Sequence, residues 1–158
     1  MNIRPIEHRD NAKVASVIRA AFEEFGAPKQ HTVYSDASTD SLYEFFQHEK
    51  SALWVAEENG EVVGSCGVYP TEGLPDGWGE IVKFYLAKSS RGKGIGKSLM
   101  LKSIESAHNL GYKTLYIESF PEFKKAVGMY ESLGFRSIDH QMGNSGHTAT
   151  SIWMIRDV

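Results

Sequence analysis

Three glycines and three basic side chains lie close together in the stretch Arg91-Gly92-Lys93-Gly94-Ile95-Gly96-Lys97. Glycine permits positive φ and close approach of the backbone to a ligand. A helix beginning here would present free N–H groups and the positive end of its dipole to an anion. The stretch therefore predicts a loop that binds a diphosphate. A helix cap with close packing is the simpler interpretation of the glycines alone.

Two other phosphate-binding motifs fail on spacing. Gly96-Lys97-Ser98 resembles the end of a Walker A loop, but that motif needs a glycine five positions before Gly96, where Arg91 stands. A dinucleotide fingerprint needs its third glycine at position 97, and this chain has it at 96. Both spacings disfavour a P-loop nucleotide enzyme and a nicotinamide-dependent enzyme.

The loop needs a strand before it and a helix after it, and the pattern predicts a strand over 80–87 and a helix over 94–109. Asn59-Gly60 between two strand-like runs indicates a tight hairpin. The other expected elements are strands at 2–6, 53–58, 61–69, 114–119, 135–142 and 147–156 and helices at 9–25, 39–49 and 122–133. This order predicts one domain over 1–158 with an α+β fold: a mixed, mostly antiparallel sheet of about seven strands with helices on both faces.

The pattern Arg/Gln-x-x-Gly-x-Gly/Ala at a strand-to-helix junction resembles the acyl-CoA loop of the GNAT (Gcn5-related) superfamily of N-acetyltransferases. The segment from Ala126 through Tyr130 to Gly134-Phe135 resembles the second conserved segment of that family, in which a tyrosine approaches the CoA sulfur. The element order fits the family from Asn2 to the C-terminus. The chain departs from many members at Lys88, where proline is common, and at Phe123, where an asparagine touches the pantetheine.

The resemblance implies an acetyl-CoA-dependent N-acetyltransferase. The backbone of Tyr85 and Leu86 would bind the pantetheine as an added strand, and Ser119 or a backbone group would replace the missing asparagine. The residues expected to bind the CoA are Tyr85, Leu86, Arg91, Gly92, Lys93, Gly94, Ile95, Gly96, Lys97 and Ser119. The acceptor would be a primary amine.

A protonated amine is a poor nucleophile, so a base helps acyl transfer, and an acid helps the thiolate leave. Glu80 is the predicted base, acting directly or through water. Alternation places it on one face with Val82, Phe84 and Leu86, where apolar neighbours would raise its pKa. Tyr130 is the predicted acid. The alternatives are a solvated carboxylate at the start of a strand and a tyrosine that only packs in the core.

The acceptor is expected to bind between the first two helices, in residues 20–48, with 70–79 and 143–147 closing the other side. The first segment contains several acidic and aromatic side chains, namely Glu23, Glu24, Phe25, His31, Tyr34 and Asp36. Acidic groups attract a cationic amine, which favours a small amine or an amino acid. The alternatives are a protein N-terminus, a lysine side chain, or a non-catalytic acyl-CoA-binding sensor domain.

The overall composition argues against several classes of protein. A net charge of −3 and a pI near 6.1 argue against a broad nucleic-acid surface. The sequence has no signal segment and no membrane-spanning run, and its single cysteine, Cys66, cannot form an internal disulfide. A cytoplasmic protein without a metal site is expected. The alternating segment 148–154 is compatible with a strand that pairs between two subunits, so a homodimer is an open expectation.

Overall fold

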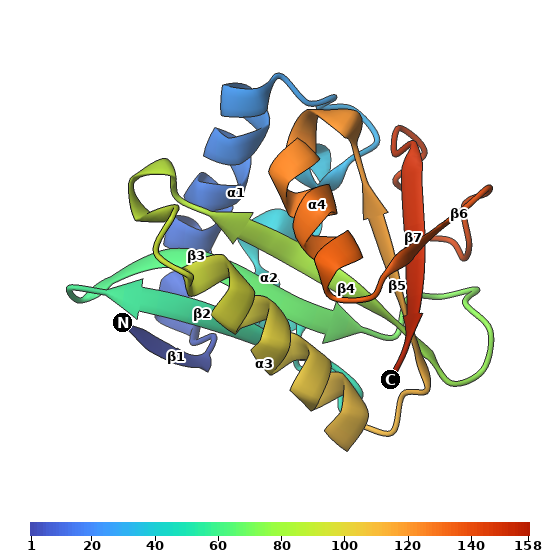
Figure 1. Ribbon diagram of the computed structural model, residues 1–158. Helices are drawn as coiled ribbons and strands as arrows, with labels where there is room; N and C mark the ends of the chain where they lie inside the picture. The colour runs from blue at the N-terminus through green and yellow to red at the C-terminus, as the bar shows by residue number, and fades with distance from the viewer.

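Seven strands form one mixed sheet in the order β1-β2-β3-β4-β5-β7-β6 (Figure 1). This computed structural model describes all 158 residues. The strands are β1 (Asn2–Pro5), β2 (Ala52–Glu58), β3 (Glu61–Tyr69), β4 (Trp78–Leu86), β5 (Thr114–Ser119), β6 (Arg136–Ile138) and β7 (Ile152–Asp157). Only β4 and β5 pair in parallel. The predicted mixed, mostly antiparallel sheet is confirmed.

Four α-helices cover the two faces of the sheet, as expected. They are α1 (Asn11–Phe25), α2 (Leu42–Phe45), α3 (Ile95–Asn109) and α4 (Lys124–Ser132). One core cluster gathers buried residues of α1 and α2, and the other gathers those of α3 and the partly buried apolar residues of α4 (Figure 1). None of the helices combines the length and the apolar composition needed to cross a bilayer.

Local residue types explain where α1 and the first hairpin begin and end. The buried face of α1 has Val14, Ile18 and Phe22 at helical spacing, and Gly26 ends the helix with φ 67°. Asn59 and Gly60 both have positive φ, 54° and 80°. That is the geometry of a tight hairpin turn, and it joins β2 to β3 as predicted.

The parallel pairing of β4 with β5 is short. It runs from Trp78 opposite Thr114 to Glu80 opposite Tyr116 and then stops. Beyond this point the two strands diverge, so the second half of β4 lies beside an opening in the sheet. The separated strands create the space in which the candidate site lies.

A bulge in β4 corrects one prediction. Lys83 has φ 57°, a left-handed conformation that is rare for a side chain with a Cβ, and the pairing of β3 with β4 shifts register here. Glu80 shares its face with Val82 as expected. Phe84 and Leu86 instead pack in the α3 cluster, because the extra residue reverses the alternation.

Two predicted elements are shorter than expected. The predicted helix 39–49 is reduced to α2, preceded by a 3₁₀ turn Ala37–Asp40, because the Thr39 hydroxyl donates to the Val33 carbonyl and favours a turn. The predicted strands 135–142 and 147–156 are β6 and β7, with an irregular loop over 139–151 between them. Side chains of this loop bond to a buried carboxylate of β5, which competes with strand pairing.

Candidate active site

The glycine loop has the open geometry that an anion-binding loop requires. Gly92 and Gly94 have φ of 78° and 81°, and a Cβ at either position would meet no atom within 4 Å. Gly94 is the N-cap of α3, so the helix N-terminus faces this open space. Glycine is favoured at position 96 for a different reason, because a Cβ there would lie 3.3 Å from the Phe84 ring. The loop therefore has room for an anion beside the helix N-terminus.

Two of the three cations of this loop form ion pairs within the protein. Arg91 Nη1 lies 2.6 Å from the Glu24 carboxylate, and Nη2 donates to the Leu86 carbonyl at 3.0 Å. Lys93 lies 3.2 Å from Glu58. Lys97 is exposed and forms no ion pair. Two of the three cations in this loop are thus paired with carboxylates of the protein.

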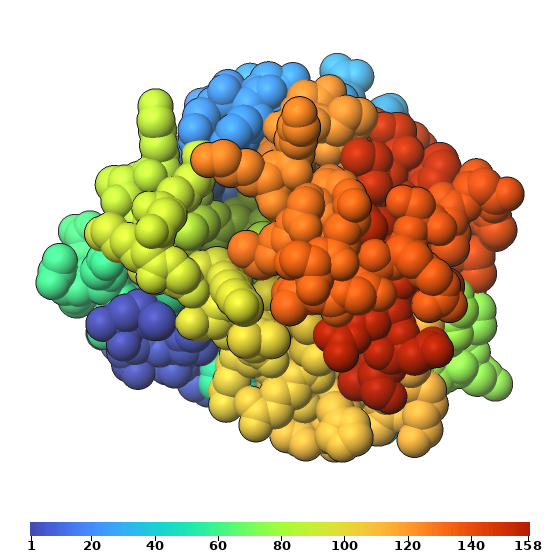
Figure 2. All heavy atoms as spheres, in the orientation of Figure 1, coloured from blue at the N-terminus to red at the C-terminus, as the bar shows by residue number.

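The opening between β4 and β5 contains a cavity of about 80 Å³. Its lining includes Phe84 and Tyr85 of β4, Ser119 of β5 and Tyr130 of α4. Figure 2 shows the surface hollowed between α1, the segment after β4 and α4. The cavity lies beside the backbone of β4 that is expected to bind the pantetheine.

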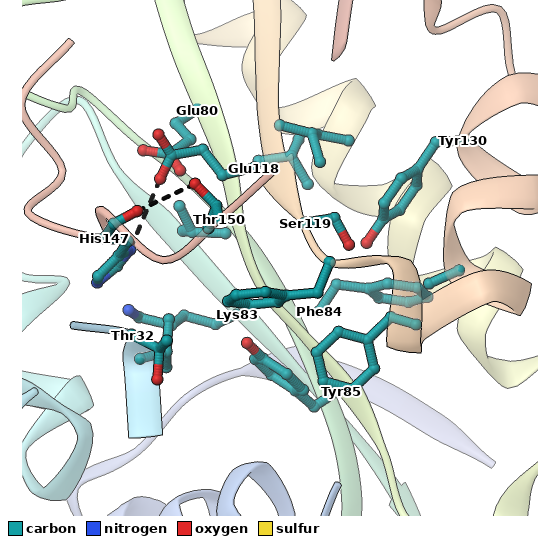
Figure 3. Close-up of a pocket in the computed structure, with 17 residues that line it drawn as sticks. Thr32, Glu80, Lys83, Phe84, Tyr85, Glu118, Ser119, Tyr130, His147 and Thr150 are labelled. Carbon is teal, nitrogen blue, oxygen red and sulfur yellow. Dashed lines mark hydrogen bonds and ion pairs between the residues drawn. The ribbon is translucent and has the colours of Figure 1, made fainter. Parts of the chain in front are cut away.

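Tyr130 is buried in this cavity wall at 5 % exposure and packs against Phe84 and Phe135. Burial, followed by the neighbouring Cys66 and Tyr85, raises its pKa well above the usual range, so the phenol keeps its proton. Its hydroxyl forms no hydrogen bond with another residue, and Figure 3 shows it facing the cavity near the Ser119 hydroxyl. A protonated phenol without a protein partner is free to donate to a ligand.

Glu80 lies at the other end of the same cavity and is only 4 % exposed. Burial raises the pKa of its carboxyl to about 7, and the negative charge of Glu118 adds to the shift. The Thr71 hydroxyl donates to Glu80 Oε1 at 2.5 Å, and this hydrogen bond lowers the pKa and so opposes the shift. A carboxyl with a pKa near neutrality is suited to accept a proton at physiological pH.

Glu118 of β5 is the buried carboxylate that stays charged. The Ser145 hydroxyl donates to it at 2.6 Å, and the Tyr116 hydroxyl and the Gln141 amide each donate at 2.8 Å. Burial would raise its pKa, but these bonds and His147 outweigh burial and lower it. Two neighbouring carboxyls with pKa values pushed apart are typical of acid–base sites.

His147 crosses from the loop 139–151 to close this end of the cavity. Its Nε2 lies 2.6 Å from Asp36 Oδ2, and its Nδ1 lies 3.7 Å from Glu118. Burial lowers the pKa of His147, but the bonds to Asp36 and Glu118 outweigh it and raise the pKa to about 9. A charged imidazolium therefore sits between the two carboxylates at neutral pH.

A second cavity of about 140 Å³ adjoins the first and shares Glu80, Val82, Lys83 and His147 with it. The rest of its lining comes from loops and aromatic side chains, namely Asp36, Ser38, Phe45, Tyr69, Thr71, Asn144 and Ser145. Glu80 thus stands where the two cavities meet. One cavity leads to Tyr130, and the other leads to the side predicted for the acceptor.

The structure brings Glu80 and Tyr130 to one cavity, together with Tyr85 and Ser119. Of the six side chains predicted for the acceptor side in residues 20–48, Asp36 lines a cavity, while Glu24 and Phe25 contact Arg91 beside the glycine loop. The predicted closing segments 70–79 and 143–147 do contribute, through Thr71, Asn144, Ser145 and His147.

Sequence reasoning missed Lys83 and Glu118 as site residues. Both lie within strands that read as ordinary, and no local signal marks Glu118 as the ion-pair partner of His147, 29 positions later. The left-handed backbone of Lys83 is equally invisible in the sequence, because the residue type does not require it.

Residues 15–135 match the profile of the Acetyltransferase (GNAT) family. The chain is 37% identical over 158 residues to the uncharacterized N-acetyltransferase YjgM of Escherichia coli, covering 99% of this chain and 94% of that protein. It is 31% identical over 115 residues to the probable N-acetyltransferase family 8 member 5 of Mus musculus, covering 70% of this chain and 51% of that protein.

A solved structure has the same fold. The putative acetyltransferase yncA of Salmonella typhimurium, determined with its cofactor acetyl-CoA, superposes with a TM-score of 0.78 at 21% identity. The superposition covers 99% of this chain and 93% of that one.

Proposed function

The chain belongs to the acetyltransferase (GNAT) family and is an acetyltransferase, and from this premise we propose that it transfers an acetyl group from acetyl-CoA to a primary amine of a small molecule or amino acid. The observation that carries the proposal is a pair of titratable groups that line one cavity in the β4–β5 opening. Glu80, with a pKa of about 7, lies at one end, and the protonated Tyr130 phenol lies at the other.

Acetyl-CoA fits the donor side of this site. The N-terminus of α3, the open loop at Gly92 and Gly94 and the free cation of Lys97 suit the diphosphate. The edge of β4 at Tyr85 and Leu86 has no strand beside it on the β5 side, so its backbone suits the pantetheine amides. The yncA structure, which has the same fold, was determined with acetyl-CoA, and this supports acetyl-CoA as the donor.

The chemistry then divides between the two ends of the cavity. Glu80 accepts a proton from the ammonium group of the acceptor, directly or through a water molecule, and leaves a nucleophilic amine. The amine nitrogen forms a bond to the acetyl carbonyl carbon, the bond from that carbon to sulfur breaks, and the nitrogen releases its second proton to solvent to become the amide. Tyr130 donates its proton to the departing thiolate and later regains one from solvent. Amide and free thiol are the products.

An amine panel tests the proposal. Wild type is incubated with acetyl-CoA and diverse primary amines, with thiol release and product mass as the readouts. We expect turnover with at least one small amine, and a fall of roughly 10²-fold or more in kcat/KM for Tyr130→Phe. Tyr43→Phe, at a partly buried tyrosine that lines neither cavity, is the matched control.

CoA binding without turnover across the panel would contradict an enzyme and favour a sensor domain. Unchanged kcat/KM in both Glu80→Gln and Tyr130→Phe over pH 6–9 would overturn the two assigned roles while leaving the transfer reaction in place.

A further inference from the structure

Lys83 is a second buried ionisable group of β4, and the bulge is what brings it into the cavity. In a regular strand, residues three apart point to opposite faces, so Lys83 would lie opposite Glu80. The left-handed φ of 57° breaks that alternation, and the Ser65 hydroxyl donates to the Lys83 carbonyl at 2.6 Å and holds the bulge. Both cavities have Lys83 and Glu80 in their walls. Strained backbone of this kind concentrates at functional sites.

The ammonium group of Lys83 has no partner in the protein. The residue is only 6 % exposed, yet it forms no hydrogen bond or ion pair with another side chain. Asp36 is bonded to His147, and Glu80 accepts from Thr71. Figure 3 shows the amino group pointing toward His147 and Thr32, away from Tyr130. Buried charges in proteins are normally paired, so the missing partner is expected from a ligand.

The charges around the amine position favour a ligand that is itself anionic at one end. An acceptor amine enters as a cation, and Lys83 and the His147 imidazolium would both repel it. Asp36 and Glu118 offset His147, whereas Lys83 has no ion pair of its own. Burial lowers the pKa of Lys83, and the carboxylates of Asp36 and Glu80 oppose that shift. A bound anion would favour the charged form further.

We propose that Lys83 binds a carboxylate of the acceptor, so that the substrates are compounds with a carboxylate next to the reacting amino group, that is, amino acids. The proposal rests on the proposed function, because it takes Glu80 as the group that receives the amine. The ammonium of the substrate would lie at Glu80 and its carboxylate at Lys83, both in the wall of the second cavity.

A matched set of three acceptors tests this: an amino acid, its primary amide, and the amine that lacks the carboxyl group. We expect wild type to prefer the amino acid by roughly ten- to a hundredfold in kcat/KM, the size of a charge-assisted hydrogen bond. Lys83→Asn should abolish the preference while tolerating the left-handed backbone. Lys83→Arg should retain most of it, and exposed Lys13→Gln should retain all of it.

Each other outcome is decisive. Equal rates for the three acceptors in wild type, or a preference that survives in Lys83→Asn, overturn the role of Lys83 and leave the acetyltransferase activity intact. Preference for the amide points to a protein N-terminus and also overturns it. Absence of turnover with every amine overturns the proposed function and this inference together. Unchanged CoA affinity and thermal midpoint in Lys83→Asn establish that a lost preference is not a folding defect.

Discussion

The donor side and the acceptor side of this site are built in opposite ways. The donor side is one continuous stretch, the glycine loop 91–97 at the start of α3, completed by the free edge of β4. The acceptor side is assembled from five separate segments, which supply Asp36, Thr71, Lys83, Glu118 and His147. The donor side relies on backbone conformation, whereas the acceptor side relies on buried charges that fix one another's protonation.

This difference suits two ligands of different character. A CoA diphosphate offers the same charges in every reaction, so a helix N-terminus and an open loop suffice. The acceptor must be deprotonated as well as bound, and that requires a carboxyl whose pKa is set by its surroundings. Burial makes the largest contribution to the raised pKa of Glu80, Glu118 raises it further, and His147 lowers it.

The largest expected effect is on the acceptor side. Glu80→Gln should lower kcat/KM for the amine roughly 10²- to 10⁴-fold at pH 7.5, because it removes the base. In wild type, kcat/KM should rise with pH through an apparent pKa of about 7, where Glu80 loses its proton. In Glu80→Gln this rise of kcat/KM with pH near 7 should be absent. Steady-state rates at saturating acetyl-CoA from pH 5.5 to 9 give both measurements.

The donor side provides the matching control for this variant. The affinity of Glu80→Gln for CoA, measured by calorimetry, should equal that of wild type, since Glu80 lies away from the glycine loop. A wild-type kcat/KM that does not rise with pH near 7 would contradict the assigned protonation of Glu80. A large loss of CoA affinity would contradict the separation of the two sides.

The same substitution should stabilise the fold at alkaline pH. The folded pKa of Glu80, about 7, lies above the ordinary value of 4.5. The native state therefore binds the proton more tightly, and stability falls as pH rises from about 4.5 through 7. Glu80→Gln removes this cost, so its free energy of unfolding at pH 8 should exceed that of wild type by about 1–3 kcal/mol. Thermal melts at pH 5 and pH 8 measure it.

The gain should be much smaller at pH 5, where Glu80 is protonated in the native protein. Glu131→Gln, on the exposed face of α4, is the control and should melt like wild type at both pH values. A Glu80→Gln protein that melts earlier than wild type at pH 8 would mean that the charged carboxylate is better accommodated than its burial indicates.

The donor side could be predicted from the sequence because its features are local. The glycine loop was identified because glycine at positive φ and cations near a helix start are local requirements, and Gly92 and Gly94 meet them. The order of elements along the chain followed from the hydrophobic patterns and from the Asn59-Gly60 turn. Glu80 and Tyr130 were predicted from the resemblance to the GNAT family, and both line one cavity.

The acceptor side was beyond such reasoning for two physical reasons. The bulge at Lys83 depends on its pairing with β3 and on the Ser65 hydroxyl, and neither is local to β4. The predicted strands 135–142 and 147–156 both extend into the segment 139–151, but Gln141 and Ser145 of this segment bond to Glu118 of β5 instead. Long-range polar contacts of this kind override a local pattern, and they place His147 over the site.

The smallest expected effect is on the donor side, where Glu24 competes with a phosphate for Arg91. The two side chains lie 2.6 Å apart at partial exposure, so the pair contributes little and CoA can break it. Glu24→Gln should lower the Kd for CoA about two- to threefold, and Arg91→Gln should raise it roughly fivefold, since one such contact amounts to about 1 kcal/mol. Glu23→Gln, at a carboxylate that accepts from the Tyr34 hydroxyl, is the control.

The changes in Kd for Glu24→Gln and Arg91→Gln should both shrink at 0.5 M salt, because exposed charges are screened. Weaker CoA binding in Glu24→Gln would show that Glu24 positions Arg91 for the diphosphate, and the donor side would then also depend on a contact from a distant segment.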